Sequence, residues 1–218
     1  MNFAEILFDL WRGIGTTAEV IGLSLLYGIP FACISGTLQC ELSGWPRFMV
    51  TAFIEFWRSS PIVVLLFVFF YSLPAFNIHL DAMTVSAMVL GMNIGGYGSQ
   101  AVRSGLQVID RGQREAGMAL GLTLPENLLF VLLPQAFRAG LPNYVNLLIQ
   151  LVKGTALVSL LSLADMTFRA KEIAQVTFDP APPYIALLLS YFAICYPLTI
   201  AGRYFERKLR PGGAEPHV

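Results

Sequence analysis

Charged side chains are scarce in this sequence. Of its 218 residues only 13% are Asp, Glu, Lys or Arg, whereas 56% are hydrophobic and the mean hydropathy is +0.64. A soluble domain could not hide that much apolar surface. The shortage of charge therefore excludes an ordinary soluble protein and indicates a protein that lies in a lipid membrane.

Histidine and cysteine are scarce as well. The chain has two histidines and three cysteines, at His79, His217, Cys33, Cys40 and Cys195. The cysteines have no CxxC spacing, and the histidines lie in a short outer loop and in the tail. The chain therefore has neither a zinc cluster nor a Ser-His pair for catalysis. The segment Lys153–Thr155 also lacks the glycines that precede the lysine of a phosphate loop. We therefore expect no metal site, no bound cofactor and no catalysis in this chain.

Long apolar runs are what the sequence has instead. Crossing about 30 Å of hydrocarbon takes roughly 20 mostly apolar residues. Five segments predict spanning helices, at residues 16–38, 55–74, 81–102, 142–163 and 183–202. The apolar run Ile62–Leu73 covers only about 18 Å, so we expect its helix to reach back through Arg58 and the kink at Pro61. The predicted fold is an all-α integral membrane protein with a single domain, residues 1–218.

Lysine and arginine are distributed unevenly along these segments. If the N-terminus is outside, the outer segments hold three basic residues: Arg12, Arg169 and Lys171. The inner segments hold ten: Arg47, Arg58, Arg103, Arg111, Arg114, Arg138, Arg203, Arg207, Lys208 and Arg210. This asymmetry predicts an outer N-terminus, a cytoplasmic C-terminus and a cytoplasmic segment 103–140. The basic residues then act as topology signals, and nucleic acid is not an expected partner. Glu5 and Asp9 are the wrong charge for a cleaved signal peptide, so the first span should stay attached.

Polar residues form stripes in two of the predicted spans. At 100° per residue, the polar residues of the third span fall within an arc of about 60°: Asn93, Tyr97, Gln100 and Ser104. The broad opposite face carries small residues at intervals of four: Ala87, Gly91, Gly95 and Ser99. Small residues at this spacing allow a neighbouring helix to approach closely. The polar arc should face protein or a wet cavity, because unpaired amides are costly in lipid.

The fourth span repeats the polar pattern and ends in a full charge. Its stripe consists of Asn143, Asn146, Gln150 and Lys153. Two stripes in adjacent spans favour a polar pathway through the membrane, and the alternative is that they only hold helices together. Lys153 either meets a solute carboxylate or pairs with Asp165 or Glu19.

The cytoplasmic segment 103–140 is much longer than a turn requires. Asp110 can cap a short helix that stops near Gly121, and Thr123–Glu126 has the spacing of a capping box for a second helix, running to Leu133. Pro134 and Pro142 should then break the backbone before the fourth span. The two short helices would expose apolar side chains, Leu120 and Leu122. Such a surface indicates a docking segment, and the alternative is an ordinary solvated loop.

This segment also carries a family signature. In order it reads Glu115-Ala116-Gly117, three residues, Gly121, nine residues, and Val131-Leu132-Leu133-Pro134. The pattern resembles the EAA signature, E-A-A, three, G, nine, I, one, L-P, of permease subunits of binding-protein-dependent ABC importers. Gly117 and Val131 are mild departures from it.

The rest of the chain, from about residue 14 to 205, resembles the polar amino acid branch of that family. The stretches that carry the resemblance are FWRSSPIVVLLFVFFYSLP, YGSQAVRSGLQVIDRGQREA and LPNYVNLLIQLVKGTALVSLLSLADMTFRAKEIA. Most members have glutamate where Gln100 stands, so no family role is transferred to that position. GMNIGGYGSQAVR and KGTALVSLLSLADMTF are also similar to permeases assigned to ectoine and hydroxyectoine uptake.

The resemblance implies a type I importer permease in the bacterial inner membrane. Its ATPase-coupling residues would be Arg114, Glu115, Ala116, Gly117, Leu120, Gly121, Leu133 and Pro134. It implies two ATPase subunits that bind ATP and magnesium, a second permease subunit, identical or homologous, and an external solute-binding protein. The transported solute would be a polar amino acid or a related small zwitterion. The alternative function is a membrane scaffold or enzyme subunit whose loop docks an unrelated partner.

Overall fold

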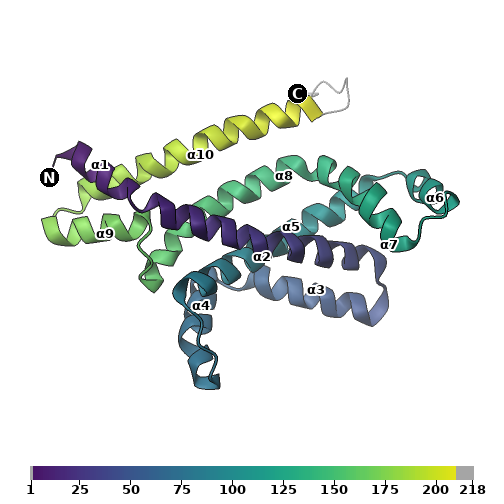
Figure 1. The fold of residues 1–218 in the computed structure, drawn as a ribbon, viewed down its shortest axis with the longest axis horizontal. Helices are drawn as coiled ribbons and strands as arrows, with labels where there is room; N and C mark the ends of the chain where they lie inside the picture. Colours follow the sequence, from purple (N-terminus) through teal and green to yellow (C-terminus); the bar gives the residue numbers. More distant parts are fainter. Residues whose placement is uncertain (1, 210–218) are drawn as a thin grey trace.

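The computed structural model describes the backbone of residues 2–209 and the side chains of residues 2–205. Within that range the chain is helical and has no strand (Figure 1). The helices are α1 (Phe3–Trp11), α2 (Ile14–Glu41), α3 (Gly44–Ser59), α4 (Ile62–Phe67), α5 (Ala82–Val108), α6 (Arg111–Ala119), α7 (Leu124–Asn127), α8 (Leu133–Gly154), α9 (Met166–Thr177) and α10 (Ala181–Leu209). Short π or 3₁₀ turns extend some of them, at Val68–Ser72, Leu73–Phe76, Leu128–Leu132 and Thr155–Leu161. Arg210 and His217 lie outside the described residues, as do the side chains of Arg207 and Lys208.

The long helices α2, α5, α8 and α10 run along the long axis of the molecule, as Figure 1 shows. Helices α1 and α9 lie at the end of the molecule that holds the N-terminus, and α6 and α7 lie at the other end (Figure 1). The segment 103–140 is therefore separated from the N-terminus by the full length of the long helices. The placement of the two on opposite sides of the membrane stays a prediction.

Helices α2 and α5 form the centre of the bundle because their backbones touch. A Cβ atom added to Gly91 would lie 2.5 Å from the Ser24 carbonyl oxygen, and one added to Gly95 would lie 2.6 Å from that of Gly28. The small-residue face of the third span, now α5, thus allows a neighbouring helix to approach closely, as predicted. That neighbouring helix is α2. Apolar side chains of α2, α5, α8 and the following 3₁₀ turn complete the core at Val20, Leu90, Ile94, Leu151 and Val158.

The number of apolar helices is smaller than the five spans expected from the sequence. By length and composition, three helical stretches qualify as spans among the described residues: Phe3–Glu41, Leu124–Leu161 and Ala181–Phe205. The bent pair Gly44–Ser59 and Ile62–Phe76 makes up to four. Helix α5, the predicted third span, is absent from this set. Its side chains and glycines are mostly buried in the bundle, so it does not need a uniformly apolar surface.

The second predicted span, 55–74, is not one kinked helix. Helices α3 and α4 meet at an angle of 98°. Ser60 between them is extended, with φ −78° and ψ 137°. A residue before proline is pushed out of the helical region by the proline ring, and Pro61 has no N–H to continue the ladder. The expectation of a helix running back through Arg58 was therefore wrong at this break.

The expected break at Pro134 and Pro142 was also wrong. The helical path continues from Leu124 to Leu161. A π turn at Leu128–Leu132 leads directly into α8, where Pro134 stands in the first turn and Pro142 lies in the interior. Proline in a first turn removes no helical hydrogen bond. At Pro142 one bond is lost, but the packing of α8 on α5 and α10 maintains the helix.

Candidate coupling segment and polar helix faces

The two short helices α6 and α7 form the bend that the sequence predicts. The Asp110 side chain accepts a hydrogen bond from the Gly112 N–H and caps α6. After α6, Gly121 has φ +85°, in the left-handed region that glycine tolerates best. The Glu126 carboxylate accepts hydrogen bonds from the Thr123 N–H and hydroxyl, at 2.8 and 2.7 Å. These contacts fix where α6 ends and α7 begins.

A buried amide, which the sequence analysis did not single out, holds the two short helices together. Asn127 is fully buried, and its Nδ2 donates to the Arg114 carbonyl oxygen at 2.8 Å. A Cβ atom added to Gly117 would lie 2.6 Å from Asn127 Cγ. The glycine at this position of the signature therefore leaves room for the asparagine. A single asparagine within the apolar run Leu124–Leu133 was the available signal.

Arg114 anchors α6 to the transmembrane body. Its guanidinium forms a bidentate ion pair with Glu41, the last residue of α2; the Nη1–Oε2 distance is 2.9 Å. Hydrogen bonds from the Arg114 side chain to Glu41 raise the pKa of the arginine above its ordinary value. The predicted ATPase contact Arg114 is thus engaged within its own chain. The ion pair therefore ties α6 directly to the end of a long helix.

The outer surface of the bend is apolar and exposed. The Leu120 side chain is 83% exposed, and Ala116, one helical turn before it, and Glu115 are exposed as well. Other exposed apolar side chains on the bend and the π turn are Leu124, Leu129 and Phe130. Leu122, which we expected to be exposed, is only partly exposed, as is Leu133, while Pro134 is exposed. The bend therefore presents a surface that the described chain does not cover.

The polar face of α5 points toward the end of α3. Asn93 is buried and its Nδ2 donates to the Trp57 carbonyl oxygen at 2.7 Å. The Tyr97 hydroxyl donates to the Arg58 carbonyl oxygen at 3.2 Å, and the Arg58 guanidinium lies 5.0 Å from the Tyr97 ring centre. The last carbonyls of a helix have no partner inside it. Asn93 and Tyr97 satisfy two of them at the 98° bend.

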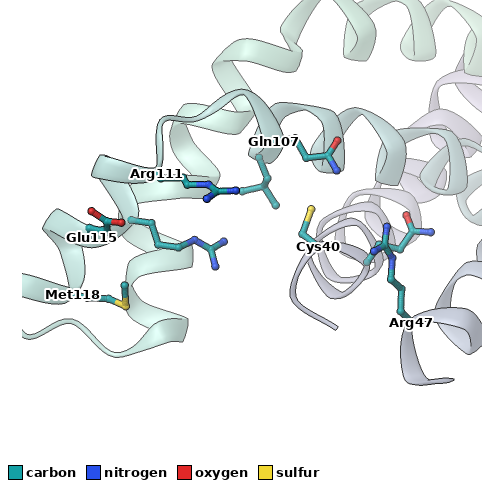
Figure 2. Close-up of a pocket in the computed structure, with 9 residues that line it drawn as sticks. Cys40, Arg47, Gln107, Arg111, Glu115 and Met118 are labelled. Carbon is teal, nitrogen blue, oxygen red and sulfur yellow. The ribbon is translucent and has the colours of Figure 1, made fainter. Parts of the chain in front are cut away.

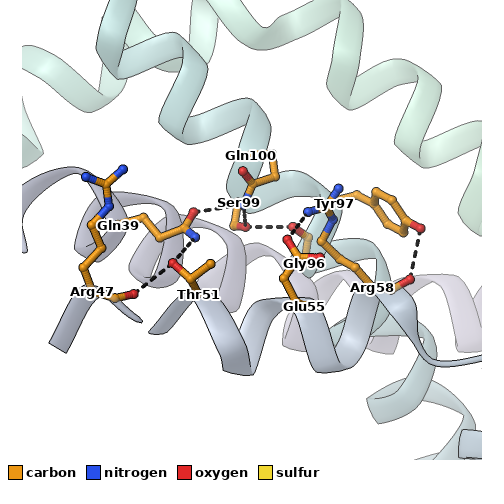
Figure 3. A network of polar contacts seen from close by, with 9 residues as sticks. All are labelled: Gln39, Arg47, Thr51, Glu55, Arg58, Gly96, Tyr97, Ser99 and Gln100. Carbon is orange, nitrogen blue, oxygen red and sulfur yellow. Dashed lines mark hydrogen bonds and ion pairs between the residues drawn. The ribbon is translucent and has the colours of Figure 1, made fainter. Parts of the chain in front are cut away.

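Gln100 continues this network toward α2 (Figure 3). Its Nε2 donates to Gln39 Oε1 at 2.9 Å, and Gln39 Nε2 donates to the Thr51 hydroxyl at 2.9 Å. The chain of bonds joins α5, α2 and α3. Asn93, Tyr97 and Gln100 are thus bonded to neighbouring helices, as in the helix-holding alternative raised by the sequence. The exposed Ser104 hydroxyl instead donates to the Ala101 carbonyl oxygen of its own helix at 3.0 Å.

The polar face of α8 behaves in the opposite way. Asn143, Asn146, Gln150 and Lys153 are all exposed in the single chain. Asn146 lines a hollow of about 240 Å³ between α8 and α10, and Lys153 lines another of about 400 Å³ with Tyr191 and Tyr196. These polar groups are available to a solute, water or a second subunit.

Lys153 does not form the ion pair with Asp165 that we considered. The Asp165 carboxylate caps α9 by accepting hydrogen bonds from the Thr167 and Phe168 N–H groups. Burial raises the pKa of Asp165, while those hydrogen bonds lower it. Among the described residues, neither Asp165 nor Glu19 lies within 4.0 Å of the Lys153 amine.

Amino-acid transport proteins resemble this chain over nearly its whole length. The L-cystine transport system permease protein TcyB of Bacillus subtilis is 32% identical, covering 90% of this chain and 85% of its own. The arginine transport system permease protein ArtQ of the same organism is 30% identical, covering 91% of both chains. The probable glutamine permease protein GlnP, also from B. subtilis, is 31% identical over 93% and 94%.

Solved transporters share the fold. The crystal structure of an amino acid ABC transporter with histidines superposes with a TM-score of 0.82 at 26% identity, covering 95% of this chain and 99% of the other. The MetNI methionine ABC transporter, in an inward-facing conformation, superposes with a TM-score of 0.79 at 20% identity, over 97% and 100%. The fold is thus the type I importer permease fold expected from the sequence.

Residues 8–211 match the family described as binding-protein-dependent transport system inner membrane component. Such subunits are not enzymes, and they work with an ATPase and a solute-binding protein. The match favours the transport subunit over the scaffold or enzyme that we kept as an alternative. This chain therefore belongs to that family, as a multi-pass permease subunit of an amino-acid ABC importer in the bacterial inner membrane.

Proposed function

We propose that the bend formed by α6 and α7 is the surface through which a cytoplasmic ATPase drives this permease. The observation that carries the proposal is Leu120, an 83% exposed leucine at the end of α6. This helix also carries the exposed Glu115 and is anchored to α2 through Arg114. Exposed apolar side chains on a rigidly held element are typical of a docking site. The ATPase would bind the ATP and magnesium, and this chain would bind neither.

The assembled importer would contain two permease subunits, identical or homologous, and two ATPases. The exposed polar face of α8 supports the second permease subunit. Lys153 and Gln150 are exposed on a membrane helix, where contact with lipid is costly. A second subunit facing α8 would remove these groups from lipid and enclose a polar path between the two chains.

The solute would be a polar amino acid or a related small zwitterion. Lys153 offers a positive charge for a carboxylate, and Asn143, Asn146 and Gln150 offer amides that donate and accept hydrogen bonds. The relatives named for cystine, arginine and glutamine agree with this class. Ectoine remains a prediction from the sequence resemblance. The external binding protein would select the solute first.

The docking role is tested by placing a charge on the bend. Leu120→Asp should abolish co-purification of the ATPase and solute uptake while the permease still inserts and folds. Val176→Asp is the matched control, because Val176 is 77% exposed and lies on α9 at the other end of the molecule. Normal ATPase association of Leu120→Asp would overturn the docking role.

The orientation is tested by labelling introduced cysteines in a variant without Cys33, Cys40 and Cys195. A membrane-impermeant thiol reagent added to intact cells should label a cysteine at Phe178 and not one at Glu115. Both side chains are exposed, so accessibility within the chain does not explain a difference. Labelling of position 115 from outside would contradict the proposed topology.

A further inference from the structure

A basic hollow lies at the junction of the transmembrane body and the bend, and it shares Arg114 and Glu115 with the proposed docking segment. It has a volume of about 410 Å³. Its lining includes arginines from α3 and α6 together with α2 and α5 side chains: Arg47, Arg111, Arg114, Gln39, Cys40 and Gln107. Figure 2 shows Arg111 and Glu115 on one side of the hollow and Arg47 and Cys40 on the other.

Two of these arginines have no acidic partner in the described chain. Arg114 is neutralised by Glu41. Among the described residues, no carboxylate lies within 4.0 Å of the Arg47 or Arg111 guanidinium. The Glu115 carboxylate lies at the α6 edge of the hollow, away from Arg47 (Figure 2). The hollow therefore has an unbalanced positive charge that favours an anion.

Two exposed aromatic residues near Arg47 favour a position of the hollow at the level of the lipid headgroups. Trp45 and Phe48, in the first turn of α3, stack with ring centres 5.3 Å apart and are 72% and 58% exposed. Exposed tryptophan on a membrane protein is enriched where hydrocarbon meets the headgroups. Arg47 lies in the same first turn of α3 and is exposed, so we expect its guanidinium to reach the headgroup region. Arginine binds phosphate oxygens through paired N–H groups.

We propose that the hollow binds the phosphate of an anionic phospholipid headgroup, held between Arg47 on α3 and Arg111 on α6. The exposed Gln107 amide can donate a further hydrogen bond to the headgroup. Basic pockets between helices at the inner face of a membrane are known to take such headgroups. A bound lipid would join the start of α3 to the start of α6. The proposal requires a membrane location only, and it is independent of ATPase docking.

The test measures lipid binding to the purified, delipidated full-length chain by native mass spectrometry. Phosphatidylglycerol should bind more tightly than phosphatidylcholine. Replacing Arg47 and Arg111 together by Gln should weaken phosphatidylglycerol binding about 25-fold, at roughly fivefold for each arginine. Arg138→Gln is the matched control: Arg138 is an exposed basic residue of the same predicted face that does not line the hollow. It should leave the preference unchanged.

Two further arms make the result decisive. Both arginines are exposed, so the double variant should melt at the wild-type temperature; the single variant Arg111→Gln serves if it does not. Inorganic phosphate in millimolar excess should fail to displace phosphatidylglycerol. Unchanged lipid preference in a folded variant would overturn the proposal. Displacement by phosphate alone would show a site for free phosphate and would equally overturn a lipid site.

Discussion

The polar faces of α5 and α8 look alike in the sequence and differ in the structure. On α5, Asn93, Tyr97 and Gln100 are bonded to α3 and α2. On α8, Asn146, Gln150 and Lys153 are exposed. The difference comes from the neighbours: α5 lies inside the bundle and faces a broken helix with free carbonyls, while α8 has one polar face that its own chain leaves uncovered. A stripe of amides in a membrane helix can thus hold neighbouring helices together or remain open to a solute or a second subunit. Sequence periodicity alone does not distinguish these two roles.

The largest effect should come from the packed face of α5. Gly91→Val would force a side chain against the Ser24 carbonyl oxygen, so α2 and α5 would have to separate. We expect a loss of about 3 kcal/mol or more, because overpacking of backbone against backbone has no side-chain relief. Thermal melting in detergent measures it.

Gly22→Val is the control for the Gly91 variant, since an added Cβ at Gly22 meets no atom within 4 Å. Similar melting temperatures for the two variants would show that the α2–α5 contact is not tight. The contrast between a tightly packed α5 and an uncovered α8 face would then not hold.

The two polar faces are compared directly by removing one amide from each. Asn93→Ala leaves the Trp57 carbonyl oxygen buried without a donor, and we expect a loss of about 1–3 kcal/mol. Asn146→Ala removes an exposed amide and should change stability by less than about 0.5 kcal/mol. Chemical or thermal unfolding of both variants checks this, and equal destabilisation would break the comparison.

Substitutions on the α8 face should affect transport more than stability, in contrast to those on the α5 face. Lys153→Gln should fold normally and lower the rate of uptake roughly tenfold, which is the effect of one lost charge-assisted hydrogen bond. Uptake into proteoliposomes with the binding protein measures it, and Lys153→Arg should keep part of the activity. Wild-type uptake by Lys153→Gln would assign the α8 face to subunit contact rather than to the solute.

A smaller loss of stability than at Gly91 should arise at the bend, where another buried amide lies. Gly117→Ala places a methyl group against Asn127 and should cost about 1 kcal/mol. In an Asn127→Ser background, with a shorter side chain, the same change should cost less. A double-mutant cycle on the free energy of unfolding measures the coupling between the two positions. Additive effects would show that Asn127 is not the reason why position 117 requires glycine.

Sequence patterns predicted the elements that depend on local chemistry. The cap at Asp110, the left-handed Gly121 and the small-residue face of α5 follow from neighbouring residues, and the structure contains all of them. The errors involve distant contacts. The continuity of α8 through Pro142 depends on packing against α5 and α10, which no local pattern reveals.

The site was predicted in the same uneven way. The exposed Leu120 and Glu115 follow from a signature, but the Arg114–Glu41 pair joins residues 73 apart in the chain. Asn127 fills a space that exists only because α6 and α7 fold against each other. A single sequence does not show which distant residues lie close in the fold, so neither Glu41 as the partner of Arg114 nor Asn127 as the neighbour of Gly117 could be predicted.

The contact of α2 with α5 has a consequence for how the transporter moves. Carbonyl oxygens of Ser24 and Gly28 meet the glycines of α5 without intervening side chains. A contact this close leaves no space for a side chain between the two helices, so we expect α2 and α5 to move as one rigid unit. A change between outward-facing and inward-facing states would then require bending elsewhere in the molecule. The 98° break before Pro61 and the π turn at Leu128–Leu132 are the positions where we expect it.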